Sequence, residues 1–190
     1  MRPALSFPPE LLLKAQGTGA GIRAAIFDVD GVLTDGRIFI TAEGESLKAF
    51  HVLDGQGLKL LAQGGIVPVV ITGRDSPAVR RRVADLGLAN ASYGISDKLS
   101  AADEWRARLG LDWSELAVIG DDWPDLPLFA RAGFACAPPN AHEEALAAAH
   151  HVTRREGGAG AAREFCDLLL VAAGRYAGLL ERVHATLDAK

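Results

Sequence analysis

The chain has 190 residues, of which 49% are hydrophobic and 23% charged, and its formal net charge is -4. This length is typical of a single domain with a sizeable core, and the mildly acidic balance argues against nucleic-acid binding, which needs basic residues concentrated on one face. The sequence lacks the layout of a signal peptide and any bilayer-spanning apolar run, and Cys136 and Cys166 lack metal-ligand spacing. We therefore expect one cytoplasmic domain over residues 1–190, without disulfides and without a membrane partner.

Three short apolar runs predict buried strands. They follow an N-terminal extension, residues 1–21, which contains a predicted helix at 11–16, and they occupy residues 22–27, 65–71 and 116–119. Predicted helices accompany them at residues 57–63, 77–86 and 98–109. Buried strands that alternate with helices predict a parallel sheet covered by helices on both faces, which is a three-layer α/β fold.

Two further segments flank this alternation. Residues 37–52 are predicted to form a β-hairpin, because apolar residues alternate with others on both sides of the turn-forming Glu43-Gly44. This segment is too small to be a separate domain. Near the other end, a glycine-rich loop at 156–160 precedes a predicted helix at 161–173, and a last amphipathic helix at 175–187 lies within a C-terminal tail, residues 174–190.

Polar side chains follow each of the three predicted strands. Asp28 and Asp30 come directly after the first strand, Thr72 after the second, and Asp121 and Asp122 after the third. In parallel sheets, ligands bind beyond the carboxyl ends of the strands. We therefore expect these five side chains to converge at one edge of the sheet.

Asp28 and Asp30 have the spacing that a phosphoryl-transfer site needs. If the strand geometry continues, two carboxylates two residues apart point the same way and form an oxygen-rich site for a hard cation such as Mg²⁺. One carboxylate can attack phosphorus to form an aspartyl-phosphate, while the second protonates the leaving alcohol and later deprotonates water. A D-x-D pair alone is more often an acidic turn, so this interpretation depends on the other residues of the set.

The complete set resembles the motifs of the haloacid dehalogenase superfamily. Asp28-Val29-Asp30-Gly31-Val32-Leu33 matches D-x-D-x-[TV]-[LV], with Asp28 at the nucleophile and Asp30 at the acid/base position. Thr72 matches the second motif, Lys98 the third, and the acidic pair at 121–122 the fourth. The resemblance implies a Rossmann-like fold and Mg²⁺ held by Asp28, Asp30 and Asp121, with Asp122 either binding through water or orienting Lys98.

Physical reasons support these positions. The Thr72 hydroxyl and the Gly73 amide can donate hydrogen bonds to phosphoryl oxygens. Lys98 supplies a positive charge that offsets the repulsion between Asp28 and a dianionic phosphate. Without a cation, several carboxylates and a phosphate could not share one pocket.

A narrower resemblance, from about residue 22 to 170, is to the 3-deoxy-D-manno-octulosonate 8-phosphate phosphatase family. The matching segments are residues 28–36, 50–59, 71–76 and 157–164. This resemblance implies a capless enzyme that assembles as a homotetramer through the hairpin at 37–52. It also implies cleavage of the 8-phosphate from an eight-carbon keto-sugar acid in the lipopolysaccharide pathway.

Arginines at family spacings indicate how an acidic sugar would be held. Arg74 and Arg82 match the family's substrate-binding arginines, and a guanidinium can hold a carboxylate in a bidentate fork. Arg82 could equally lie on a solvent-exposed helix face. Leu53 departs from the family, which commonly has Arg there, so a nine-carbon 2-keto sugar acid 9-phosphate is an alternative substrate. A non-catalytic binding protein on the same fold is the alternative from another class.

Overall fold

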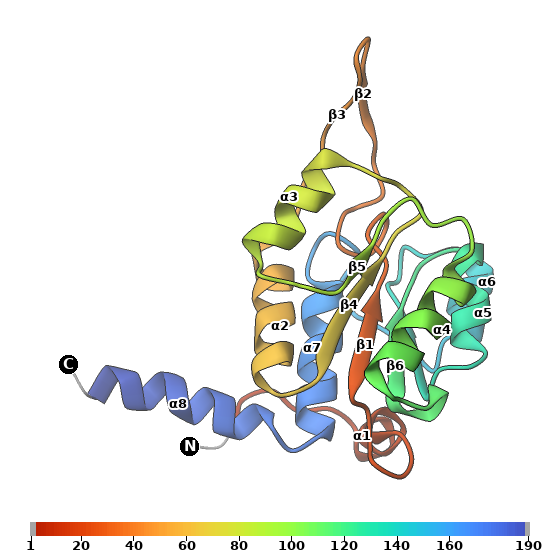
Figure 1. Cartoon of the computed structure of the whole chain (residues 1–190). Helices are drawn as coiled ribbons and strands as arrows, with labels where there is room; N and C mark the ends of the chain where they lie inside the picture. Colours follow the sequence, from red (N-terminus) through yellow and green to blue (C-terminus); the bar gives the residue numbers. More distant parts are fainter. Residues whose placement is uncertain (1–2, 189–190) are drawn as a thin grey trace.

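The computed structural model describes residues 3–188 and contains a six-stranded parallel sheet (Figure 1). In spatial order the strands are β5 (Ala91–Ser92), β4 (Val67–Ile71), β1 (Ala24–Phe27), β6 (Leu116–Ile119), β7 (Phe134–Ala137) and β8 (His151–Val152). Every pairing in this sheet is parallel. Residues 1–2 and 189–190, the ends of the predicted N-terminal extension and C-terminal tail, lie outside the described residues.

Helices cover both faces of the sheet, which confirms the predicted three-layer α/β fold. One layer holds α1 (Pro9–Gln16), α2 (Val52–Gln63), α3 (Pro77–Asp85) and α7 (Ala161–Ala172). The opposite layer holds α4 (Lys98–Leu109), α5 (Leu126–Phe129) and α6 (Glu143–Ala148). The two strand faces alternate, so that Phe27 packs in the first core and Ile26 in the second. None of the helices within residues 3–188 has the length and apolar character that crossing a membrane requires.

The order of the strands explains where a ligand would bind. The chain starts at β1, adds β4 and β5 on one side, and then adds β6, β7 and β8 on the other. Phe27, the last residue of β1, is in register with Val70 of β4 and with Ile119 of β6. The residues that come after these three adjacent strands therefore meet at the point where the strand order reverses, which is the usual ligand site of such sheets.

The predicted hairpin forms a separate two-stranded sheet. β2 (Phe39–Thr41) and β3 (Gly44–Leu47) pair antiparallel and project beyond the carboxyl ends of the main strands (Figure 1). Ile40 and Leu47 of this hairpin are 74% and 51% exposed. The chain then enters α2 at Val52, so no cap domain follows the first motif in the described part of the chain.

Other elements differ from the sequence-based expectations in detail. α2 begins at Val52 rather than at Gly57, and the strands β5, β7 and β8 extend the sheet beyond the three predicted ones. Two 3₁₀ turns, Trp113–Glu115 and Trp123–Asp125, flank β6. The last helix, α8 (Tyr176–Asp188), extends away from the sheet at the amino ends of the strands (Figure 1).

Candidate active site

A pocket of about 370 Å³ lies at the carboxyl edge of the sheet. Its lining contains all the predicted site residues except Arg82, namely Asp28, Asp30, Thr72, Gly73, Arg74, Lys98, Asp121 and Asp122, and it also contains Asp125. The chain topology thus brings together residues from four segments that are up to about a hundred positions apart in sequence.

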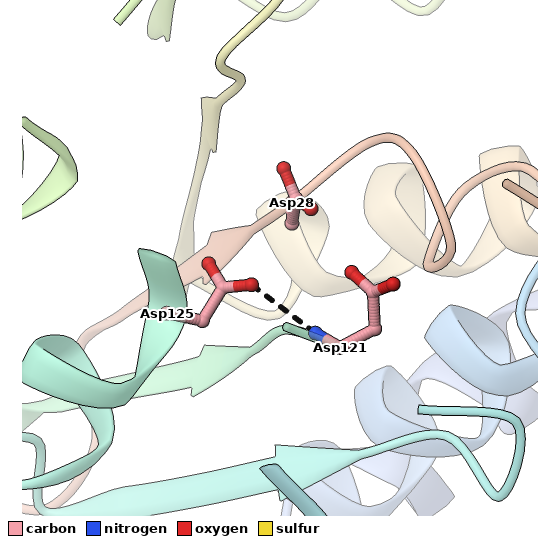
Figure 2. A group of neighbouring side chains, drawn as sticks. All are labelled: Asp28, Asp121 and Asp125. Atoms are coloured by element: carbon pink, nitrogen blue, oxygen red, sulfur yellow. Dashed lines mark hydrogen bonds between the residues drawn. The ribbon is translucent and has the colours of Figure 1, made fainter. Parts of the chain in front are cut away.

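Three carboxylates that line this pocket lie close together (Figure 2). Asp28, Asp121 and Asp125 each offer an oxygen within 4.8 Å of the other two. Asp28 is fixed by the sheet, since its backbone amide donates to Ile119 O over 3.1 Å. Gly31 allows the Asp121 carboxylate to approach the loop after β1, because a side chain at position 31 would place its Cβ 1.9 Å from Asp121 Oδ2. The φ of Gly31 is +86°, which also favours glycine at this position.

Lys98 is the cation of this group. It is the first residue of α4, which Asp97 caps by accepting a hydrogen bond from Ser100 N. Its Nζ lies 2.9 Å from Asp28 Oδ1 and 2.7 Å from Asp125 Oδ1, and all three side chains are almost fully buried. Burial opposes the ammonium form, but the two carboxylates outweigh it and raise the pKa of Lys98, so the side chain is charged at neutral pH.

Asp125 is a functional residue that the sequence did not reveal. Its Oδ1 holds Lys98, and its Oδ2 accepts hydrogen bonds from the amides of Asp121 and Asp122 at 3.1 and 3.4 Å. Gly120 leaves room for it, because a Cβ there would lie 2.3 Å from Asp125 Cγ. Asp125 therefore fixes both the lysine and the backbone of the acidic pair.

Of the two roles predicted for Asp122, the orientation of Lys98 is wrong, because Asp125 occupies that position; binding of the cation through water stays a prediction. The Asp122 carboxylate instead accepts a hydrogen bond from Trp123 N at 2.8 Å and caps the 3₁₀ turn at 123–125. In the described chain, Asp122 is outside the group of three close carboxylates, although it lines the pocket. This placement favours Asp121 over Asp122 as a direct metal ligand.

The expected alignment of Asp28 and Asp30 is also wrong. β1 ends at Phe27, and the chain turns at once, with Leu33 N and Thr34 N both donating to Val29 O. The strand does not continue, and among the described residues the carboxylate of Asp30 is not a member of the three-carboxylate group but forms ion pairs with Lys48 and Arg74. Asp30 remains at the pocket wall.

The donor set fits a hard divalent cation. Asp121 Oδ1 is buried and has no hydrogen-bond partner among residues 3–188. Three carboxyl groups here face one ammonium, so ionising all three would leave two negative charges without a counter-charge. Burial and the charges of Asp28 and Asp125 raise the pKa of Asp121 to about 8, and burial and Asp125 raise that of Asp28 to about 6. A cation between Asp28 and Asp121 would relieve this repulsion, and oxygen ligands suit Mg²⁺.

Mg²⁺ should consequently stabilise the fold through Asp121. At a hundred times its dissociation constant it adds about 2.7 kcal/mol to the free energy of unfolding, which raises the melting temperature by about 5 to 10 °C. We expect Asp121→Asn to lose most of this shift and Asp122→Asn, its neighbour, to retain it, as measured by calorimetry with and without Mg²⁺. Equal shifts in both variants would contradict the assignment of Asp121.

The remaining predicted residues lie at different depths. Thr72 is 1% exposed and lines the pocket beside Gly73. The Arg74 guanidinium is half exposed at the pocket, with Nε 3.6 Å from Asp30 Oδ2. Arg82 instead lies on α3 against α2, where its Nη2 donates to His51 O at 3.4 Å and its guanidinium stacks over Phe50. Within this chain, Arg82 therefore does not reach the pocket that contains Asp28.

Leu53 likewise lies away from this pocket. It is 51% exposed at the start of α2 and lines a second pocket, of about 350 Å³, with His51, Arg154 and Arg155. The departure at Leu53 therefore does not alter the carboxylate group or Lys98.

Known proteins are similar in sequence to this chain over most of its length. Residues 92–165 match the haloacid dehalogenase-like hydrolase family. A 3-deoxy-D-manno-octulosonate 8-phosphate phosphatase from Yersinia pestis is 44% identical over 159 residues, which are 84% of this chain and 85% of that protein. The protein of the same name from Haemophilus influenzae is 44% identical over 81% of this chain and 86% of its own length.

Solved structures agree with this similarity. The 3-deoxy-D-manno-octulosonate 8-phosphate phosphatase from Moraxella catarrhalis, solved in complex with a magnesium ion, a phosphate ion and a KDO molecule, is 40% identical. It superposes with a TM-score of 0.85 over 92% of this chain and 98% of its own. The phosphatase from Yersinia pestis gives a TM-score of 0.84 over 90% of each chain.

Proposed function

Since the chain belongs to the 3-deoxy-D-manno-octulosonate 8-phosphate phosphatase family of haloacid dehalogenase-like hydrolases, we propose that it is a Mg²⁺-dependent phosphomonoesterase that cleaves this sugar phosphate to the free sugar acid and phosphate. The observation that carries the proposal is the buried group of Asp28, Asp121 and Lys98 at the carboxyl edge of the sheet. A nucleophile, a cation-binding oxygen and a fixed positive charge meet there.

In the first half of the reaction, Asp28 is the nucleophile. One of its carboxylate oxygens bonds to phosphorus as the bond between phosphorus and the sugar oxygen breaks. Asp30 gives a proton to the departing sugar oxygen, which leaves as the alcohol. Thr72 and Gly73 donate hydrogen bonds to the non-bridging oxygens, and Lys98 offsets the charge that develops on them.

In the second half, water replaces the sugar. Asp30, now ionised, takes a proton from a water molecule, whose oxygen bonds to phosphorus as the bond to Asp28 breaks. Inorganic phosphate leaves, and the Asp28 carboxylate and the protonated Asp30 are restored. When bound by Asp28 and Asp121, Mg²⁺ supplies positive charge that lets a phosphate dianion approach these carboxylates.

The exact sugar acid is the part of the proposal that needs a direct comparison. Arg74, at the rim of the pocket, offers a guanidinium to a substrate carboxylate. Because Leu53 replaces the arginine that is common in the family, the nine-carbon 2-keto sugar acid 9-phosphate should be tested as a second substrate. Phosphate release should be measured for both compounds with Mg²⁺, and we expect the larger kcat/KM for the eight-carbon substrate. A larger value for the nine-carbon compound would replace the proposed substrate and leave the phosphatase chemistry unchanged.

We propose in addition that the chain works in the cytoplasm as a homo-oligomer, a tetramer, assembled through the β2–β3 hairpin. Both cysteines are buried and free, as in a reducing compartment. Ile40, Phe39 and Leu47 expose apolar surface on the hairpin. In the absence of a cap domain, a neighbouring subunit would close the pocket.

A charge on the hairpin should dissociate this assembly. We expect Ile40→Glu to yield a monomer by light scattering and to lower phosphatase activity, because burying the glutamate in an apolar interface is unfavourable. The matched control is Leu13→Glu, which changes a similarly exposed leucine on α1 and should leave both properties unchanged. A fully active Ile40→Glu monomer would contradict the role of the hairpin.

A further inference from the structure

Lys48 is a buried lysine that has no part in the steps proposed above for Asp28 and Asp30. It comes directly after β3, and its side chain has no exposed surface. Its ammonium contacts Asp30 Oδ1 and lies 3.4 Å from Glu45 Oε2. A buried ammonium is unfavourable unless carboxylates surround it, so both partners are needed to keep Lys48 in this place.

Glu45 is fixed in turn by the main domain. Its Oε1 accepts a hydrogen bond from Ser76 Oγ at 2.6 Å, and Ser76 is the residue that precedes α3. A continuous series of polar contacts therefore runs from Asp30 through Lys48 and Glu45 to Ser76. It joins the loop after β1 to the hairpin and to the start of α3.

The orientation of the Asp30 carboxyl group depends on this series of polar contacts. It lies in the turn after β1, where no strand pairing orients it, and among residues 3–188 the ion pairs to its carboxylate come from Lys48 at Oδ1 and Arg74 at Oδ2. The Arg74 side chain is 53% exposed, so it holds Asp30 weakly, whereas Lys48 is immobilised by burial. The hairpin thus sets the direction in which the Asp30 carboxyl group points.

We propose that Lys48, supported by Glu45, is a positioning residue that holds Asp30 in line with the departing oxygen of the substrate. This inference rests on the proposed function through the role of Asp30 in proton transfer. It also gives the hairpin a second task besides subunit contact, because the hairpin carries both Glu45 and Lys48.

The test compares leaving groups that depend to different extents on protonation by Asp30. Phenyl phosphate and p-nitrophenyl phosphate have similar shapes, but phenolate leaves poorly without a proton and p-nitrophenolate leaves well. Leaving-group release is measured with enzyme in excess, so that only the first chemical step is observed. The variants are Asp30→Asn, Lys48→Met and Glu45→Gln, and the control is Lys59→Met, which changes an exposed lysine on α2.

We expect Asp30→Asn to slow phenol release by about 10²- to 10⁴-fold and p-nitrophenol release far less. Lys48→Met should show the same selectivity with a loss of about tenfold or more for phenyl phosphate, and Glu45→Gln a smaller one. Lys59→Met should equal the wild type.

A merely structural role for Lys48 would slow both aryl phosphates equally and would overturn the proposal, as would wild-type rates in Lys48→Met. If Lys48→Met does not fold, the two aryl phosphates are compared with Glu45→Gln instead. This variant keeps Lys48 and removes the negative charge of one of its two carboxylate partners. Absence of selectivity in Asp30→Asn would remove the acid role of Asp30 and this inference with it. Failure of the wild type on the sugar phosphate alone would reject the proposed substrate and leave the leaving-group comparison intact.

Discussion

Asp28→Asn is expected to lower phosphate release from the sugar phosphate by about three to six orders of magnitude, as removal of a covalent nucleophile does elsewhere. The amide is nearly the same size as the carboxylate but cannot attack phosphorus. Initial rates with saturating Mg²⁺ measure the loss. Asp28→Ala should be measured in parallel, because slow deamidation of the asparagine would regenerate the wild-type enzyme.

The same substitution should not destabilise the metal-free protein. Burial and the charge of Asp125 raise the pKa of Asp28 to about 6, so ionisation of this carboxyl group at neutral pH lowers the stability of the folded state. A neutral side chain removes that repulsion. We expect the melting temperature of Asp28→Asn in a chelator to equal or exceed that of the wild type. Asp85→Asn, at an exposed ion pair on α3, is the control. A large fall in melting temperature would show that Asp28 is a structural residue.

Lys98→Met is expected to have the second largest effect, on both stability and activity. It leaves Asp28 and Asp125 buried without their ammonium partner, and removing one partner from a buried ion pair costs about 3 to 5 kcal/mol. Loss of the charge that faces the phosphoryl group should also lower kcat by about 10²- to 10³-fold. Urea unfolding at neutral pH and initial rates measure the two effects.

The loss of stability in Lys98→Met should depend on pH. Asp28 and Asp125 raise the pKa of Lys98 above its ordinary 10.5, so the wild-type pair is intact throughout the neutral range. In the variant the unpaired carboxylates are disfavoured only when ionised. As pH falls, Asp28, whose pKa burial already raises to about 6, takes up a proton and the difference from the wild type should shrink. Lys59→Met should stay within about 0.5 kcal/mol of the wild type at every pH. A pH-independent difference would point to lost packing instead of lost charge.

The central strands and the pocket residues could be predicted because their signals are local. Apolar runs before Asp28, Thr72 and Asp121 mark three strands, and parallel pairing then brings the residues after these strands to one edge of the sheet. The strands β7 and β8 lack such signals. β7 consists of Phe134, two alanines and Cys136, and β8 has two residues, so their places depend on the sheet already formed.

The first residue of α2 was predicted wrongly because of its glycines. Glycines are typical of turns, and the helix was expected to begin only at Gly57, after Gly55. In the structure they lie inside the helix and allow close packing, because a Cβ on Gly57 would lie 3.1 Å from Arg163 Cα of α7. A helix partner a hundred residues away cannot be recognised from the local sequence.

Asp125 and Lys48 were missed for a related reason. Asp125 meets Lys98 across 27 positions, and Lys48 meets Asp30 across 18. No local pattern distinguishes them from ordinary surface charges, which is how most charged residues in a hairpin or a turn behave. Their burial between oppositely charged groups is visible only in the folded chain.

The most direct test of the proposed chemistry is a search for phosphate on Asp28 during turnover. The enzyme is mixed with 3-deoxy-D-manno-octulosonate 8-phosphate and Mg²⁺, quenched in acid within one turnover, and digested for mass spectrometry. We predict one added phosphoryl group on the peptide that contains Asp28, absent when a chelator replaces Mg²⁺. Rapid phosphate release with no phosphoryl group on that peptide at any time within the turnover would contradict the role of Asp28 as nucleophile.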